Sequence, residues 1–387
     1  DGPGQDPYLI HSVEGKEYRT KVSTLRGDYR KDDGSSVDQL RPWVKDDIKP
    51  QSTDIFQERL YCIQWMRQKK NSKSDEYEFR TVTADDLRRE NDVETFVAAH
   101  LADWQANGWI PDMRIEAGDK TDEPIRTRGW TYWHHLFNPR QLLVAGLVNR
   151  FSDARMKIGL TQVLNTSARL TRWSLGDGVG RSGGVKQVFD NQALNTLFNY
   201  GCRASRFSLS SIDTAYKHFP LSGVKTTVLN APAKEVDESF DIFVTDPPYG
   251  DAVKYEEILE FFIAWLRKSP PPEFADWTWD SRRALAIKGE DDDFRRGMVA
   301  AYKRMTELMP DNGLQIIMFT HQSGSIWADM ANIVWASGLH VTAAWYVVTE
   351  TDSALREGSH VKGTVLLVLR KRLGELESVA LEANGTR

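Results

Sequence analysis

The sequence predicts an α/β fold: a doubly wound, mostly parallel sheet with an antiparallel edge strand, preceded by an appended α+β module. Two observations indicate this class. After residue 220, apolar stretches of strand length alternate with amphipathic stretches of helix length, which is typical of strand–helix–strand units in a parallel sheet. The last two expected strands, 340–350 and 363–371, have no helix between them. They should therefore pair as an antiparallel hairpin at one edge of the sheet.

Residues 1–125 form the appended module, a candidate for recognising a DNA target. Three short strands are expected in it, at 16–25, 58–66 and 77–83. A helix should follow at 83–108, because Thr83 suits an N-cap and Gly108 suits a helix end. A lysine-rich connector holds Lys69, Lys70 and Lys73. It suits contact with a DNA backbone, although a solvated turn is the simpler interpretation.

Residues 126–219 change to helical patterns. Asn138 and Pro139 have the pattern of an N-cap followed by the first helical residue. A second helix is expected at 156–174, and the segment 184–201 is interpreted as a strand or turn leading into a third. Between these two segments lies a glycine-rich loop, "LGDGVGRSGGV".

Residues 220–374 carry the strand and helix alternation and are interpreted as a catalytic domain, with 375–387 as a tail. The expected strands are 225–231, 240–246, 314–321, 340–350 and 363–371. The expected helices are 255–268, 293–309 and 325–338. In such sheets ligands bind at the carboxyl ends of the strands, so the residues that follow each strand are the first candidates for a site.

Composition excludes several classes of protein. The chain has 387 residues, a net charge of -5 and 27% charged residues, and no apolar run reaches the roughly 18 residues that a membrane span needs. Its two cysteines, Cys62 and Cys202, favour a reducing cytoplasm. The adjacent His134 and His135 lack the spacing of metal ligands, so no metal site is expected. The acidic balance argues against a bulk nucleic-acid coating protein but allows a DNA enzyme with a local basic groove.

The strand expected at 240–246 ends on Asp246, Pro247, Pro248 and Tyr249. An exocyclic amine of a nucleobase is a poor nucleophile, because its lone pair is delocalised into the ring. A carboxylate and a carbonyl fixed by a following proline can accept its two N–H groups, which favours a more tetrahedral nitrogen. Tyr249 offers a ring face for a base that has left its stack. The motif therefore suits amine methylation better than hydrolysis.

Around this motif the sequence resembles a bacterial family of adenine-specific DNA methylases whose typical members also carry a zinc ribbon. The blocks that carry the resemblance are "WTYWHHLFNPRQLL", "SFDIFVTDPPYGDAVKYEEILEFFIAWL", "MFTHQSGSIWADM", "WYVVTE" and "VLLVLRKR", within residues 126–372. The resemblance implies a class I methyltransferase (Rossmann-like) fold and S-adenosyl-L-methionine as cofactor. It also implies Asp246, Pro247, Pro248 and Tyr249 as catalytic residues, with Tyr249 and Gly250 as substrate-binding residues.

Two features depart from the family pattern. No zinc ribbon is present, and the cofactor loop of the type Asp-Pro-Phe-x-Gly-x-Gly is missing. The only glycine-rich candidate, 176–184, is preferred as a connector, so an upstream region or a partner subunit is expected to supply the loop. Candidate cofactor-binding residues are Asn230, placed by resemblance near the cofactor adenine, and Thr320 and His321, which follow a strand. A turn residue and a locally hydrogen-bonded histidine are the respective alternatives.

The function expected from these observations is transfer of a methyl group to adenine N6 of a base flipped out of double-stranded DNA, in the cytoplasm. The family resemblance adds a role in restriction-modification or anti-phage defence, with other subunits as partners. Three alternatives stay open: cytosine N4 as acceptor, RNA as substrate, and a non-catalytic DNA-binding subunit of a defence complex. The segment 267–290 is a candidate loop over the substrate or, equally, a packed surface lid.

Overall fold

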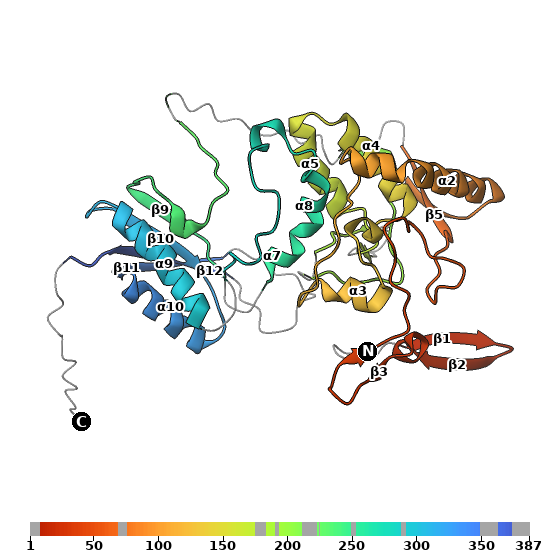
Figure 1. The fold of residues 1–387 in the computed structure, drawn as a ribbon, viewed down its shortest axis with the longest axis horizontal. Helices are drawn as coiled ribbons and strands as arrows, with labels where there is room; N and C mark the ends of the chain where they lie inside the picture. Colours follow the sequence, from red (N-terminus) through yellow and green to blue (C-terminus); the bar gives the residue numbers. More distant parts are fainter. Residues whose placement is uncertain are drawn as a thin grey trace. The chain divides into compact units, whose positions relative to one another are not determined.

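The computed structural model describes residues 8–68, 76–174, 183–189, 193–210, 223, 225–248, 253–287, 292–348 and 363–373. The chain divides into two compact units (Figure 1). Unit 1 comprises Asp1–Gly223 with Tyr255–Ser281, and unit 2 comprises Val224–Lys254 with Arg282–Arg387. No helix of the described residues is long and apolar enough to cross a membrane.

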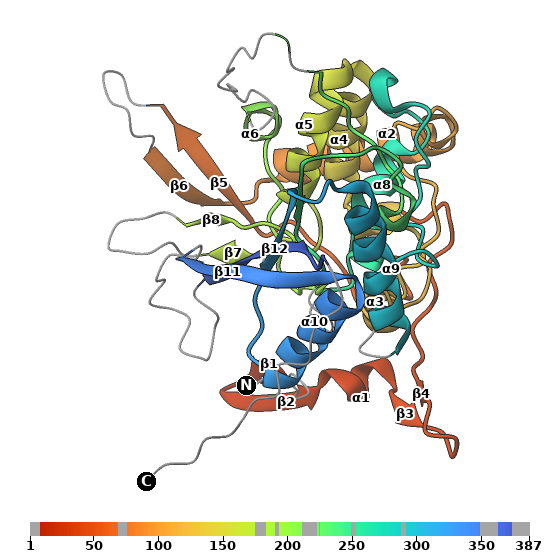
Figure 2. The same cartoon turned by 90° about the vertical axis from the view of Figure 1, so that its left-hand side faces the viewer.

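The described residues of unit 1 form four small antiparallel pairs of strands, two of which are the hairpins seen in Figure 2. The first hairpin pairs β1 (Tyr8–Val13) with β2 (Lys16–Lys21), and the second pairs β5 (Cys62–Arg67) with β6 (Glu76–Thr81). The other two are β3 (Tyr29–Arg30) with β4 (Ser36–Val37), and β7 (Trp173–Ser174) with β8 (Gly184–Val185). The strand predicted at 16–25 ends at Lys21, because α1 (Val22–Arg26) follows it and buries Val22.

Two of the predicted helix starts in unit 1 are confirmed. Helix α2 (Ala84–Ala106) begins at the N-cap Thr83, whose hydroxyl accepts from the Asp86 N–H while the Asp86 carboxylate accepts from the Thr83 N–H. Helix α4 (Pro139–Phe151) begins with the same reciprocal arrangement between Asn138 and Gln141. These two boundaries depend on residues three positions apart, which explains why the sequence predicts them.

The remaining helical segments described in unit 1 are short, and the sequence predicts only those at 156–174 and 255–268. They are α3 (Asp122–Arg128), the 3-10 turn η1 (Trp133–Leu136), α5 (Ala154–Asn165), α6 (Ser205–Ser210), α7 (Tyr255–Ile258), α8 (Glu260–Leu266) and the 3-10 turn η3 (Pro272–Phe274). The helix predicted at 156–174 therefore ends at Asn165, because the following turn directs Arg169 into the core. The helix predicted at 255–268 is interrupted at Leu259.

The third predicted helix is wrong within the described residues 193–201, which have no regular structure. Even-numbered side chains of this segment contact other parts of unit 1. Leu194 is buried, Thr196 bonds Thr127 at 2.7 Å, and Tyr200 accepts from Asn138 at 3.4 Å. A period of two residues is that of an extended chain, so these contacts override the local helix preference.

Unit 2 contains one four-stranded mixed sheet (Figure 1). Its strands are β9 (Ile242–Thr245), β10 (Leu314–Phe319), β11 (Leu339–Val348) and β12 (Gly363–Lys371), in the order β11-β12-β10-β9. Strands β9 and β10 are parallel, and β12 is antiparallel to both β10 and β11. The predicted antiparallel pairing of the last two strands is confirmed. The antiparallel strand β12, however, lies second from the edge, because it pairs on both sides.

The strand predicted at 225–231 is wrong: the described residues there are irregular, with Val228 and Leu229 exposed. β-Forming side chains alone do not make a strand when no neighbouring strand pairs with them. The segment contains only the short turn η2 (Ala233–Glu235) before β9. With one parallel pair among the described strands, a doubly wound sheet is not evident, and that fold class stays a proposal.

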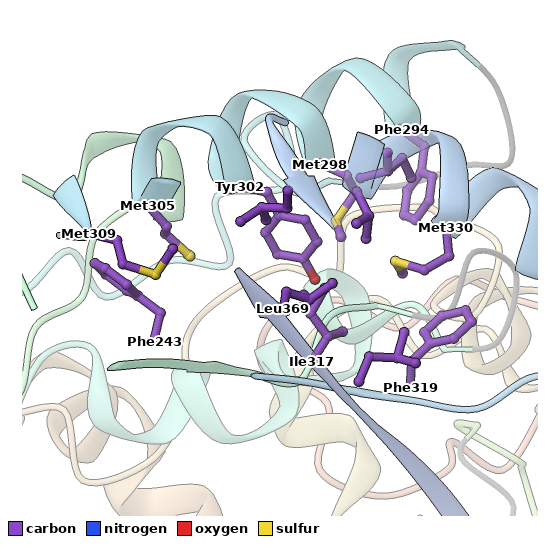
Figure 3. Packing of buried hydrophobic residues seen from close by; sticks show 14 residues of the cluster. Phe243, Phe294, Met298, Tyr302, Met305, Met309, Ile317, Phe319, Met330 and Leu369 are labelled. Carbon is purple, nitrogen blue, oxygen red and sulfur yellow. The ribbon is translucent and has the colours of Figure 1, made fainter. Parts of the chain in front are cut away.

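The core of unit 2 lies between the sheet and two helices, α9 (Asp292–Leu308) and α10 (Gly324–Ala336), close to their predicted ranges (Figure 3). Alternate residues of β10, namely Gln315, Ile317 and Phe319, face this core and are buried. Both helices thus cover one face of the sheet. On β9 the alternate residues Ile242 and Val244 remain 54% and 61% exposed. The packing of α9 and α10 on the sheet holds β9 and β10 in place, and with them the sheet edge at which both strands end.

Candidate functional site

The candidate site lies at the edge of the unit 2 sheet where the parallel strands β9 and β10 both end. The register pairs Thr245 of β9 with Ile317 of β10, so Asp246 begins the segment that leaves this edge. Asp246 is exposed, Pro247 is buried and Pro248 is half-buried. Neither proline can donate a ladder hydrogen bond, which explains why the strand ends here while its carboxylate stays accessible.

Of the predicted site residues, Tyr249 and Gly250 lie outside the described residues. Thr320 and His321 follow directly after β10 and therefore stand at the same sheet edge as Asp246. Asn230 is exposed and lies in the irregular segment before β9, so it is not at the end of a strand as predicted. The structure thus brings Asp246, Thr320 and His321 to one edge.

His321 is engaged in the turn that starts α10. Its Nδ1 accepts the Ser323 N–H at 3.0 Å, and its carbonyl oxygen accepts from the Trp327 indole Nε1 at 2.9 Å. Ser323 is the N-cap of α10 and accepts in turn from the Ser325 N–H at 3.3 Å. These contacts match the alternative interpretation of a histidine with local hydrogen bonds, and a role for His321 in binding a cofactor remains a proposal.

Sequence reasoning missed Tyr302 of α9. Its side chain is 2% exposed, and in Figure 3 its hydroxyl points from the helix towards the sheet. The hydroxyl oxygen lies 3.5 Å from Thr245 Oγ1, and Thr245 Oγ1 lies 3.4 Å from the Ile316 carbonyl oxygen. Burial raises the pKa of Tyr302 to about 12; the hydrogen bond from Thr245 opposes the rise, and the nearby charge of Asp246 adds to it. A protonated phenol therefore lies buried next to Thr245, the residue that precedes Asp246.

One signal in the sequence marks Tyr302. The buried residues of α9 are Phe294, Met298, Ala301, Tyr302, Met305 and Thr306. Two of them carry a hydroxyl group, and a buried hydroxyl needs a partner. Thr306 donates back to the Tyr302 carbonyl at 2.8 Å, whereas the longer Tyr302 side chain reaches beyond the helix. The sequence shows this helical pattern, but it does not show which strand residue the Tyr302 hydroxyl reaches.

The described residues do not fit a nucleoside cofactor. Such a group is normally held by a strand, a glycine-rich loop and a helix N-terminus in succession. The glycine-rich segment 176–184 instead lies between β7 and β8, which pair with each other, and Gly183 has a left-handed φ of +70° with Ser174 beside it. Residues 176–182 of this segment lie outside the described part of the chain.

His134 and His135 are buried in unit 1 and act as structural residues. His135 accepts the N–H groups of Thr131 and Tyr132 at Nδ1, at 3.1 and 3.2 Å, and its Nε2 donates to the Val44 carbonyl at 3.0 Å. Burial lowers the pKa of His134 to about 4, and burial together with the charge of His134 lowers the pKa of His135. Within the described ranges no three His, Cys, Asp or Glu side chains gather as metal ligands.

This pair predicts a loss of stability in mild acid. Both histidines are neutral when folded but titrate near 6.5 when unfolded, so below that pH the unfolded state binds more protons. The free energy of unfolding should therefore fall as the pH drops, by about 2 kcal/mol between pH 6.5 and 5.5 for the two groups. Urea denaturation at several pH values measures it. Replacing the exposed His340 by Asn should leave this dependence unchanged, whereas a flat profile in the wild type would contradict the assignment.

Comparison with protein-family models, with curated proteins and with solved structures finds no match in any of the three.

Proposed function

We propose that this chain carries the methyl-acceptor part of an S-adenosylmethionine-dependent DNA methyltransferase that forms N6-methyladenine. The observation that carries the proposal is the placement of Asp246, Pro247 and Pro248. They leave the carboxyl edge shared by two parallel strands, with the carboxylate exposed and the first proline buried. This edge is where open α/β sheets bind ligands, and Tyr249 follows directly in the sequence.

On the acceptor side, the residues have separate tasks. The Asp246 carboxylate accepts one N–H of the exocyclic amine, and the Pro247 carbonyl accepts the other. Pro247 and Pro248 hold these two acceptors in place, since proline fixes the backbone φ angle. Tyr249 stacks on the flipped base, a contact worth roughly 1–3 kcal/mol. In this proposal the residues that bind the methyl donor lie outside the described part of the chain.

In this proposal Tyr302 positions Asp246 indirectly, through its hydrogen bond with the preceding residue, Thr245. Replacing Tyr302 by Phe removes one hydroxyl without changing the shape of the core, and we expect kcat to fall about 2- to 10-fold, the equivalent of one net hydrogen bond. KM for DNA should not change, because Tyr302 is buried and does not touch the substrate. Tyr346→Phe, at an exposed tyrosine of the same unit, is the matched control. Equal kcat values for the wild type and the Tyr302 variant would rule out this role.

A non-catalytic DNA-binding subunit is the second candidate function. It is favoured by the poor fit of the described residues to a nucleoside cofactor. Cytosine N4 and RNA remain alternatives within the methyl-transfer chemistry. For the DNA substrates we propose a cytoplasmic protein that binds double-stranded DNA with other subunits of a restriction-modification or anti-phage defence system.

The deciding experiment is transfer of a labelled methyl group from S-adenosylmethionine to DNA by the natural full-length protein with its partner subunits. Digestion of the product to nucleosides then separates N6-methyladenine from N4-methylcytosine, and an RNA substrate is run in parallel. Label in N6-methyladenine supports the proposal. Tight DNA binding without transfer to any of these acceptors would overturn it in favour of the non-catalytic subunit.

A further inference from the structure

Arg128, the last residue of α3 in unit 1, is held between two aromatic rings. Its guanidinium carbon lies 4.4 Å from the ring centroid of Phe56 and 4.5 Å from that of Phe198. The residue is only 8% exposed. Its one hydrogen bond runs from Nη1 to the neighbouring Thr127 carbonyl at 3.3 Å. The two rings are 6.1 Å apart and inclined at 63° to each other, so the guanidinium makes a cation–π contact with each of them.

The carboxylates around Arg128 are committed to other arginines. Glu58 holds Arg169 through two contacts of 2.6 and 2.7 Å, and Glu123 accepts from Arg126 at 3.1 Å. Among the described residues no carboxylate forms an ion pair with Arg128 itself. Its positive charge consequently has no direct counter-ion in this part of the chain.

The pKa of Arg128 also indicates that its charge is not compensated. Burial and the positive charge of Arg26 lower the pKa of Arg128 to about 10, and the more distant Glu123 and Glu58 only partly offset this. A buried charge without a partner is costly. A cost of this kind is often found where a protein binds a ligand.

The Arg128 guanidinium also has N–H groups that can donate to a ligand. Within the described ranges Nε and Nη2 have no hydrogen-bond partner, yet neither is among the fully enclosed nitrogens that lack one. Both groups therefore still meet solvent. A planar guanidinium offers parallel N–H groups that match the oxygens of a carboxylate or a phosphate, often in pairs.

We infer that Arg128 binds a phosphate oxyanion in the frame of Phe56 and Phe198, and that this phosphate belongs to the backbone of bound DNA. The second part rests on the proposed function, because a DNA methyltransferase must hold its duplex by the backbone as well as by the flipped base. Such a contact positions the duplex and carries no sequence information. Arg128 thus acts as a DNA-anchoring residue of unit 1.

The salt dependence of DNA affinity tests this assignment in the full-length protein. We expect Arg128→Gln to weaken binding of a labelled duplex similarly for unrelated sequences, and to reduce the slope of log K against log salt by about 1. Arg126→Gln is the matched control, since Arg126 lies on the same helix but is exposed and paired with Glu123; its slope should equal that of the wild type. Equal slopes for the wild type and Arg128→Gln would overturn the DNA assignment.

Inorganic phosphate separates the two possible sources of the anion. Millimolar phosphate should raise the thermal midpoint of the wild type, by mass action on the folded state, and should not raise that of Arg128→Gln. A phosphate effect without a change in the DNA slope would retain the anion site but overturn its DNA assignment. Absence of both effects would overturn the inference as a whole.

The folded state of the variant provides an independent check. Removing a guanidinium that has no counter-ion should leave the thermal midpoint of Arg128→Gln unchanged or higher, whereas removing a structural cation would lower it. Arg128→Lys keeps the charge but loses the flat pair of N–H groups, and it is the second variant if the first does not fold. A wild-type protein that shows the DNA slope but no methyl transfer would refute the proposed function and leave this site intact.

Discussion

Replacing Asp246 by Ala is expected to lower methyl transfer to DNA by a factor on the order of 10²–10³, the usual loss when one preorganised hydrogen-bonding group is removed from a reacting centre. The reason is the exposed position of the carboxylate at the strand end, where alanine accepts no N–H from the amine. DNA affinity should change little, because backbone contacts dominate it. Single-turnover transfer of labelled methyl measures the loss.

Two further variants sharpen this test. Asp246→Asn keeps the size of the side chain and one acceptor oxygen, so its loss should be smaller than that of Asp246→Ala. Asp241→Asn removes an exposed carboxylate at the opposite end of β9 and should transfer at the wild-type rate. Normal transfer by Asp246→Ala would remove this residue from the mechanism.

Local interactions explain which parts of the fold the sequence predicts. The starts of α2 and α4 are set by capping pairs three residues apart, at Thr83 and Asn138. The strand predicted at 225–231 fails because pairing requires a distant partner that residue types do not reveal. The end of α5 at Asn165 is equally hidden, since Arg169 is drawn inwards by Glu58, which lies far away along the chain. Local signals thus predict element starts better than they predict pairing.

In the candidate site, too, local sequence predicts some residues and only the tertiary fold reveals the others. Asp246, Pro247 and Pro248 are adjacent, and their chemistry can be read from residue types alone. Tyr302 lies 57 positions beyond Thr245, and only the packing of α9 on the sheet brings the two hydroxyl groups together. The Arg128 frame likewise joins rings from two separate segments. Contacts between residues so far apart in the sequence depend on the tertiary fold, and no sequence pattern predicts them.

Arg169→Met is expected to lower the free energy of unfolding of unit 1 by about 3–5 kcal/mol, because it leaves several carbonyl oxygens without their hydrogen-bond donor, at about 1–3 kcal/mol for each buried one. Arg169 is fully buried. Besides its two bonds to Glu58, its guanidinium donates to the carbonyl oxygens of Ile48, His135 and Phe137 at 3.1, 2.7 and 2.6 Å. Methionine fills much of the same space but leaves these acceptors and the Glu58 carboxylate without partners.

Urea denaturation followed by tryptophan fluorescence measures this loss, because the rings of Trp43 and Trp130 lie 5.3 and 5.5 Å from the Arg169 guanidinium carbon. Arg172→Met, at an exposed arginine three positions further along, controls for the loss of a charge and should cost less than about 0.5 kcal/mol. Glu58→Gln keeps an acceptor for Arg169 and should cost less than Arg169→Met. A wild-type midpoint for Arg169→Met would mean that the carbonyl groups it holds find other donors, and that the chain between residues 48 and 137 is positioned by apolar packing alone.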